Sequence, residues 1–135
     1  MTLFVCVDDE GGMAFGGRRQ SRDSIVFEDI FSECSGEPLL IAPYSEKLLS
    51  PLGRVKVKRD PIGAAKRRSF VFLEDRAAGE DKEKVDRLII YRWNRHYPAD
   101  LYFDIDPTEC AFTLESSTEL VGTSHEKITK EIYVK

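Results

Sequence analysis

The sequence contains few of the residues that bind metal ions or form disulfide bonds. It has three cysteines, at Cys6, Cys34 and Cys110, and two histidines, at His96 and His125. The cysteines form no C-x-x-C pair, which excludes a zinc ribbon and a dithiol redox motif. The histidines lack the spacing of metal ligands, so we expect no metal site. We interpret the cysteines as buried thiols of a protein in a reducing compartment.

Long apolar segments and a surplus of positive charge are also absent from the sequence. No run approaches the roughly 18 apolar residues of a membrane span. The apolar residues 1–7 have no basic flank and no cleavage site, so we expect no signal peptide. The net charge of −4 creates no overall attraction to nucleic acid or to an anionic membrane. We therefore expect a cytoplasmic protein without a membrane partner.

The composition that remains is typical of one folded domain. Hydrophobic residues make up 41% of the chain and charged residues 33%, a balance that argues against wholesale disorder. A chain of 135 residues has room for one core. Residues 1–135 contain no repeat, linker or low-complexity segment, so we expect a single domain.

The pattern of apolar residues predicts strands connected through helices early in the chain. The apolar run 3–7 is typical of a strand buried on both faces. Ser21 or Asp23 is expected to cap a helix that continues to Cys34 and ends at Gly36. Further strands are predicted at residues 38–42, 69–73 and 88–93.

The remaining segments complete an α/β fold. They are predicted as a polar, glycine-rich loop at 8–20, a short helix at 45–50, an edge strand at 54–58, a loop or short exposed helix at 75–86, a continuation of the sheet edge at 101–103, and an antiparallel hairpin at 111–115 and 127–134. This order predicts a single mixed, mainly parallel sheet with flanking helices and a C-terminal antiparallel hairpin.

The chain resembles the dihydrofolate reductase family in this order of elements. The first strand, Asp8, the loop 11–17 and the helix 23–34 resemble that family's first strand, active-site loop and first helix. Residues 37–42, Glu-Pro-Leu-Leu-Ile-Ala, resemble the strand that leads to its cofactor-binding turn. Near the end, the segments 97–109, 111–115 and 124–133 mirror the family's aspartate-to-F-P-x-I stretch and closing hairpin. The resemblance implies a reduced, divergent form of this fold.

The substrate side of the chain departs from the family pattern. Arg18-Arg19-Gln20 stands where the family has a leucine-proline-tryptophan run. Ile25 stands where the family places its substrate-binding carboxylate, and Asp23 and Glu28 lie nearby but out of register. The resemblance therefore does not carry the family's substrate over to this chain.

The cofactor side departs as well. In the family, a glycine, a basic residue and a hydroxyl hold cofactor phosphates, and here only the hydroxyl of Ser45 remains. Glu74-Asp75 replaces the Gly-Gly that admits the dinucleotide, and its charge would repel a pyrophosphate. Lys58 and Arg59 remain candidates for contact with a 2′-phosphate. We therefore expect weak NADPH binding and a loss of reductase activity, with a residual reductase as an alternative.

A first candidate site is the basic loop that leads into the predicted helix. Arginine side chains and free N–H groups at a helix N-terminus bind phosphates and carboxylates. The expected ligand-binding residues here are Arg18, Arg19, Gln20, Ser21 and Asp23. As an alternative, the arginines pair with the acidic residues 8–10 or face water.

A second candidate site is the aromatic and basic segment 91–97. Its ligand-binding candidates are Arg92, Asn94 and Arg95, because arginines interleaved with aromatics contact phosphates and stack on bases. The favoured alternative is a strand in which Tyr91 and Trp93 enter the core on one face, with the polar residues on the other.

The third candidate is His125, a weak candidate for acid–base catalysis beside Ser124 and Glu126. A polar hairpin turn is the simpler interpretation, and the basic run 66–68 is interpreted as a solvated loop. Together these features predict a domain that binds a small anionic or nucleotide-like ligand. The other alternative is an RNA-binding protein or ribonuclease that uses Arg19, Arg92, Arg95 and His125.

Overall fold

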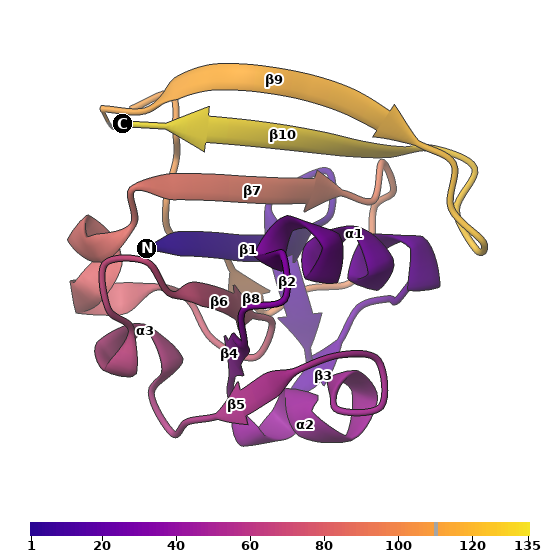
Figure 1. Cartoon of the computed structure of the whole chain (residues 1–135). Coiled ribbons are helices and arrows are strands. Elements are labelled where there is room, and N and C mark those ends of the chain that lie inside the picture. Colours follow the sequence, from indigo (N-terminus) through magenta and orange to yellow (C-terminus); the bar gives the residue numbers. More distant parts are fainter. Residues whose placement is uncertain (110) are drawn as a thin grey trace.

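A seven-stranded sheet runs through the centre of the computed structural model, which describes residues 1–109 and 111–135 (Figure 1). Its strands lie in the order β5 (Val55–Val57), β4 (Leu39–Ile41), β6 (Phe70–Leu73), β1 (Thr2–Val7), β7 (Arg87–Arg92), β10 (Ile128–Val134) and β9 (Thr113–Leu120). The first five are parallel, whereas β10 runs antiparallel to β7 and pairs with β9 as a hairpin. The predicted mixed, mainly parallel sheet is confirmed, and β5 is an edge strand as expected.

Helices form where the capping signals predict them. In α1 (Ser24–Cys34), the Asp23 side chain accepts a hydrogen bond from the N–H of Ile25. The helix ends at Ser35 and Gly36, which both have a positive φ. The predicted cap at Asp23 is therefore confirmed.

The shorter helices differ from the prediction in their details. Helix α2 (Pro43–Leu49) begins two residues earlier than expected, because proline suits the first turn of a helix. A further helix that was not predicted, α3 (Pro61–Ala64), follows the edge strand, with the Asp60 side chain as its N-terminal cap. A 3₁₀ helix, η1 (Gly79–Lys84), lies in the segment 75–86, which was predicted as a loop or short exposed helix.

A second, three-stranded sheet corrects two predictions. Residues 8–20 are not a loop, since β2 (Gly12–Phe15) and β3 (Arg18–Arg19) form a hairpin. Its two-residue turn, Gly16-Gly17, has a positive φ at both positions, which glycine adopts without strain. Strand β8 (Leu101–Tyr102) pairs with β2 and does not extend the main sheet. The Gly-Gly turn signal was present in the sequence, but the residues before it, Gly-Met-Ala-Phe, do not alternate between apolar and polar, and the strand after it has only two residues.

Apolar side chains pack on both faces of the main sheet. On one face, α1 and α2 cover a cluster that includes Phe4, Phe27 and Phe72. On the other face, Leu3 and Val5 pack with residues of β2, α3 and the segment 103–107. The predicted double burial of β1 is confirmed. No helix within the described residues is long and apolar enough to cross a membrane.

The cysteines that the structure describes are free thiols. Cys34 is buried in α1 and Cys6 is half-buried on β1. The prediction for Cys110 lies outside the described residues.

Candidate functional site

The carboxyl ends of three parallel strands bring the candidate residues to one edge of the sheet. Strands β6, β1 and β7 lie side by side, so Glu74, Val7 and Trp93 end them or follow them at the same edge. Ligands of open α/β sheets bind in such positions. On the α1 side, residues 19–23 and the loop 121–127 between β9 and β10 also reach this edge.

His125 is buried at this edge and is held on three sides. The residue is 3% exposed, and its ring stacks on Trp93 with 4.6 Å between the ring centroids. Its Nδ1 lies 3.1 Å from Asp23 Oδ2, while Nε2 lies 3.1 Å from both Ser21 Oγ and the Tyr97 hydroxyl. Because an ionised carboxylate only accepts hydrogen bonds, Nδ1 donates to Asp23, and in the tautomer with its proton on Nδ1 alone, Nε2 accepts from the hydroxyls.

Asp23 is the anchor of this cluster. Besides capping α1, its carboxylate accepts hydrogen bonds from the backbone N–H groups and hydroxyls of Thr123 and Ser124 and from the N–H of His125. Burial by itself would raise the pKa of Asp23, but these hydrogen bonds lower it well below the usual range. A side chain at position 122 would collide with the Asp23 carboxylate. Glycine therefore allows the backbone of the loop 121–127 to lie directly against Asp23. Asp23 thus joins the start of α1 to the C-terminal hairpin.

A second polar network lies on the same side of the sheet, between β3, β6 and α2. The Arg19 guanidinium binds the Glu74 carboxylate through two parallel hydrogen bonds of 2.8 and 2.9 Å. The Ser45 hydroxyl donates to Glu74 Oε2 at 2.6 Å, and Arg19 also lies over the Tyr44 ring. Hydrogen bonding to Glu74 raises the pKa of Arg19. Arg19 therefore pairs neither with residues 8–10 nor with water alone, and the charge of Glu74 is compensated within the protein.

A small cavity separates the two networks. Its volume of about 10 Å³ is room for roughly one water molecule. The residues that line it include Cys6, Gln20, Ser21, Phe27, Phe72 and Trp93.

The polar wall of this cavity has one buried acceptor atom without a partner. Gln20 Nε2 donates to Asp8 Oδ2 and to the carbonyl of Pro98, whereas Gln20 Oε1 meets no hydrogen-bond donor among the described residues. Burial, with a smaller effect of Glu74, raises the pKa of the Cys6 thiol, which makes this cysteine a poor nucleophile. The free acceptor of Gln20 suits a ligand that carries an N–H or O–H group.

Comparisons with known proteins bear on the fold of the chain. No family model matches the sequence, and no curated protein matches it. Among solved structures, it is similar to a dihydrofolate reductase from Enterococcus faecalis complexed with NADP(H) and RAB-propyl. The TM-score is 0.63, and the match covers 98% of this chain and 94% of that chain at 11% sequence identity. The chain has the dihydrofolate reductase-like fold. The resemblance read from the order of elements is thereby confirmed for the fold alone.

On this reductase-like fold, the predicted site residues divide between the two faces of the sheet. Trp93 and Ile89 lie in the cluster on the α1 side together with Tyr91, as the alternation of β7 predicts. Arg92 points to the opposite face, where its Nε donates to Glu131 Oε1 at 2.6 Å. The structure therefore does not bring Arg92 together with Arg19.

The other basic and polar candidates also lie outside the His125 cluster. Asn94 is exposed and donates to the carbonyl of Lys127 and the hydroxyl of Thr129. Arg95 is exposed, and so is Arg18, which neighbours Arg19 on a strand and therefore points to the other side. Of the eight predicted ligand-binding residues, Arg19, Gln20, Ser21 and Asp23 lie together.

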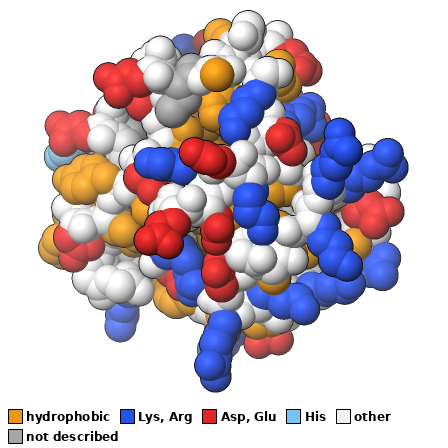
Figure 2. Space-filling view, turned by 90° about the vertical axis from the view of Figure 1, so that its left-hand side faces the viewer, with side chains coloured by type: hydrophobic (Ala, Val, Ile, Leu, Met, Phe, Trp, Pro, Cys, Tyr) orange, Lys and Arg blue, Asp and Glu red, His pale blue; other side chains and the backbone are white. Residues whose placement is uncertain are grey.

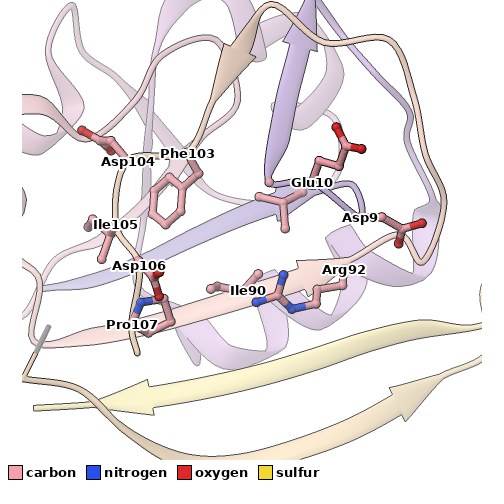
Figure 3. Close-up of a pocket in the computed structure, with 11 residues that line it drawn as sticks. Asp9, Glu10, Ile90, Arg92, Phe103, Asp104, Ile105, Asp106 and Pro107 are labelled. Atoms are coloured by element: carbon pink, nitrogen blue, oxygen red, sulfur yellow. The ribbon is translucent and has the colours of Figure 1, made fainter. Parts of the chain in front are cut away.

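A larger cavity of about 430 Å³ opens on the opposite face of the sheet (Figure 3). Val7, Ile90 and Phe103 form apolar parts of its wall. Figure 3 shows Arg92 beside this cavity, while the Asp104 carboxylate is turned away and accepts from the N–H groups of residues 78 and 79. Within residues 1–109 and 111–135, no group of three or more acidic, histidine or cysteine side chains is placed to hold a metal ion.

The three residues predicted to bind a cofactor also lie apart from one another. Ser45 is buried and its hydroxyl is engaged by Glu74, whereas Lys58 and Arg59 are exposed just beyond the edge strand β5. Sequence reasoning missed Tyr97 and Tyr44 as partners of His125 and Arg19, and it missed the link between Glu74 and Arg19. Nothing in the local sequence signals these contacts, because each joins residues at least 25 positions apart.

Proposed function

We propose that this chain is a small-ligand-binding domain with a reductase-like fold that does not use NADPH as the reductases do. The observation that supports this is the hydrogen-bonded network of Arg19, Glu74 and Ser45. By the resemblance, Glu74 stands where the family admits the dinucleotide, and Ser45 is the remaining phosphate-binding hydroxyl. A phosphate that reached Ser45 would have to replace its hydrogen bond to Glu74 and approach the Glu74 charge. Either change leaves a buried charged group without its partner, which is costly.

The ligand that fits this site is small and polar. Gln20, whose buried Oε1 has no partner among the described residues, lines the cavity together with Ser21 and Trp93. Arg18 and Arg22 are exposed next to this segment and form no ion pair with any described residue, which favours an anionic or nucleotide-like ligand. The cavity admits only a group about the size of a water molecule, so most of such a ligand lies outside it.

Titration with NADPH tests this function. Trp93 is the single tryptophan of the chain and lines the cavity, so its fluorescence reports binding there. We expect no saturable quenching up to about 1 mM NADPH, which corresponds to a binding free energy weaker than about −4 kcal/mol. The matched variant replaces Glu74 by glycine and Arg19 by alanine, which removes the ion pair between these residues. This variant should bind NADPH more tightly than the wild type. Saturable quenching of the wild type at micromolar NADPH, with oxidation of NADPH by dihydrofolate, would contradict the proposal.

Nucleic-acid binding is a second candidate, favoured by a concentration of positive charge. Residues 54–68 contain seven basic residues and one acidic residue, although the whole chain has a net charge of −4. All seven basic side chains are exposed, and none forms an ion pair with a described residue. Lys56, Lys66 and Arg68 line a shared depression of about 220 Å³, and Figure 2 shows Lys and Arg side chains gathered along one flank of the molecule. Phosphate groups are the ligands that such a surface attracts.

The salt dependence of RNA binding tests this second candidate. We expect a single-stranded RNA oligonucleotide to bind with a dissociation constant of about 10⁻⁴ to 10⁻⁶ M, weakening as salt rises. Replacement of Lys66, Arg67 and Arg68 by alanine should reduce the slope of log K against log salt by about 2, since each phosphate contact contributes about 0.7. The control replaces three other exposed basic residues outside the segment 54–68 and outside the proposed ligand site, Lys82, Arg95 and Lys127, and should leave the slope unchanged. Fluorescence anisotropy measures both, and equal slopes in the two triple variants would exclude this surface.

A further inference from the structure

Ser21, His125 and Asp23 form a continuous series of hydrogen bonds. Ser21 Oγ lies 3.1 Å from Nε2 of His125, and Nδ1 on the other side of the same ring lies 3.1 Å from Asp23 Oδ2. This is the connectivity of a nucleophile, a general base and a carboxylate that orients the base. The neighbouring Ser124 lies on the Nδ1 side of the ring, 3.2 Å away, whereas the serine at Nε2 is 104 positions away in the sequence.

The carboxylate and the ring are both fixed in position. Asp23 Oδ2 accepts hydrogen bonds from the N–H groups of Ser124 and His125 and from the Ser124 hydroxyl, in addition to the ring. The stacked Trp93 fixes the plane of the imidazole. A ring held in this way presents the lone pair of Nε2 to the Ser21 hydroxyl, which is how a general base is prepared for proton abstraction.

We propose that Ser21 is a nucleophile, that His125 is its general base, and that the chain hydrolyses esters of small acyl groups. This goes beyond ligand binding, and it does not depend on whether NADPH binds. The half-buried Ser21 borders the small cavity, whereas His125 is shielded behind it. The cavity volume of about 10 Å³ admits at most a methyl-sized group, so it favours an acetyl ester whose methyl group enters the cavity while the ester carbon and the leaving group lie outside.

The reaction has two balanced steps. The Ser21 oxygen forms a bond to the acyl carbon while its proton moves to Nε2 of His125, and the bond from that carbon to the leaving oxygen breaks. The leaving group departs with the electron pair and takes the proton from His125. Water then attacks the acyl-serine in the same way, which releases the carboxylic acid and restores Ser21. The backbone N–H groups of Ser21 and Arg22 donate to no protein group among the described residues, and we assign the developing oxyanion to them.

A variant of Tyr97 distinguishes a catalytic role of the cluster of Ser21, His125 and Asp23 from a purely structural one. Its hydroxyl shares Nε2 with Ser21 at the same distance of 3.1 Å. If the cluster only locks the hairpin to α1, both hydroxyls are equivalent and loss of either changes stability alone. If Ser21 is the nucleophile, its loss abolishes reactivity, while Tyr97→Phe leaves the Ser21–His125 pair in place.

Covalent labelling with a fluorophosphonate probe, followed by peptide mass spectrometry, tests the proposal on the full chain. We expect one adduct on Ser21, none in Ser21→Ala, and a labelling rate about 100-fold lower in His125→Gln. Ser24→Ala, which removes an exposed serine three positions away, is the matched control and should be labelled as the wild type. p-Nitrophenyl acetate should be hydrolysed faster than p-nitrophenyl octanoate. Absence of an adduct on Ser21, or equal labelling of Ser21 in His125→Gln and the wild type, would overturn the proposal.

Two further measurements test the proposal even if the His125→Gln variant fails to fold. Tyr97→Phe should retain labelling of Ser21, and the labelling rate of the wild type should rise with pH as one group loses its proton. A pH-independent rate would count against a general base. Asp23 is a positioning residue, so in a folded Asp23→Asn variant the labelling rate should fall and its pH profile should change, whereas a structural role alone would change only the melting temperature.

Discussion

Replacement of Asp23 by alanine is expected to lower the free energy of unfolding by about 4 kcal/mol, and this is the largest effect that we expect from one substitution. The buried carboxylate is hydrogen-bonded to the first turn of α1 and to Thr123, Ser124 and His125. Its removal leaves several of these donors buried without an acceptor, and hydrogen bonds to a charged group are the strong ones. Urea denaturation followed by Trp93 fluorescence measures the loss.

Asp60→Ala is the matched control for this prediction. Asp60 also caps a helix, since its side chain accepts a hydrogen bond from the N–H of Gly63, but it is exposed. Loss of an exposed cap costs about 1 kcal/mol. Similar losses in the two variants would show that Asp23 acts only as a helix cap and does not hold the hairpin.

The same carboxylate predicts how stability depends on pH. Hydrogen bonds hold the pKa of Asp23 in the folded protein below its value in the unfolded chain, which is about 4. The unfolded state therefore takes up the proton first as the pH falls. The stabilisation from Asp23 is present above about pH 4 and is lost progressively below it. Denaturation at several pH values should show this loss in the wild type and a weaker one in Asp23→Ala.

Replacement of Arg19 by alanine is expected to lower the free energy of unfolding by about 3 kcal/mol. Glu74 is 6% exposed, and Arg19 is its cationic partner in a two-pronged ion pair. Without Arg19, the protein buries a carboxylate whose remaining hydrogen bond comes from Ser45. The double variant with Glu74 also changed to alanine should lose less than the sum of the two single variants, because the second change removes the unpaired charge.

The Arg92–Glu131 pair is the control for this cycle. Its nitrogen–oxygen distance is 2.6 Å, but its side chains are 34% and 18% exposed, so water compensates for the loss of one partner. Arg92→Ala is expected to cost at most about 1 kcal/mol. If the losses of unfolding free energy in the Arg19 and Glu74 variants are additive, their ion pair does not stabilise the fold.

Local patterns in the sequence predicted much of the fold. The spacing of apolar residues and the cap at Asp23 predicted α1, and the alternation along β7 correctly placed Trp93 in the core with Arg92 on the other face. These features depend on residues within one or two turns of each other, where periodicity and capping decide the structure. The hairpin of β2 and β3 was missed although its Gly16-Gly17 turn was visible, because Gly12–Phe15 does not alternate between apolar and polar residues and a two-residue strand is too short to carry a pattern.

The sequence by itself determined the strands of the main sheet, the helices α1 and α2 and their order, and through these the reductase-like fold, whereas the small sheet of β2, β3 and β8 was not predicted. It also identified Ser21 and Asp23 as ligand-binding candidates of one loop and His125 as a catalytic candidate elsewhere in the chain. Only the tertiary structure decided which of them meet: Asp23 and His125 are 102 positions apart, and Arg19 and Glu74 are 55 apart. Such pairs form because the segment after β1 and the loop between β9 and β10 both reach the edge at which β6, β1 and β7 end, whereas a one-dimensional pattern records no distance across a sheet.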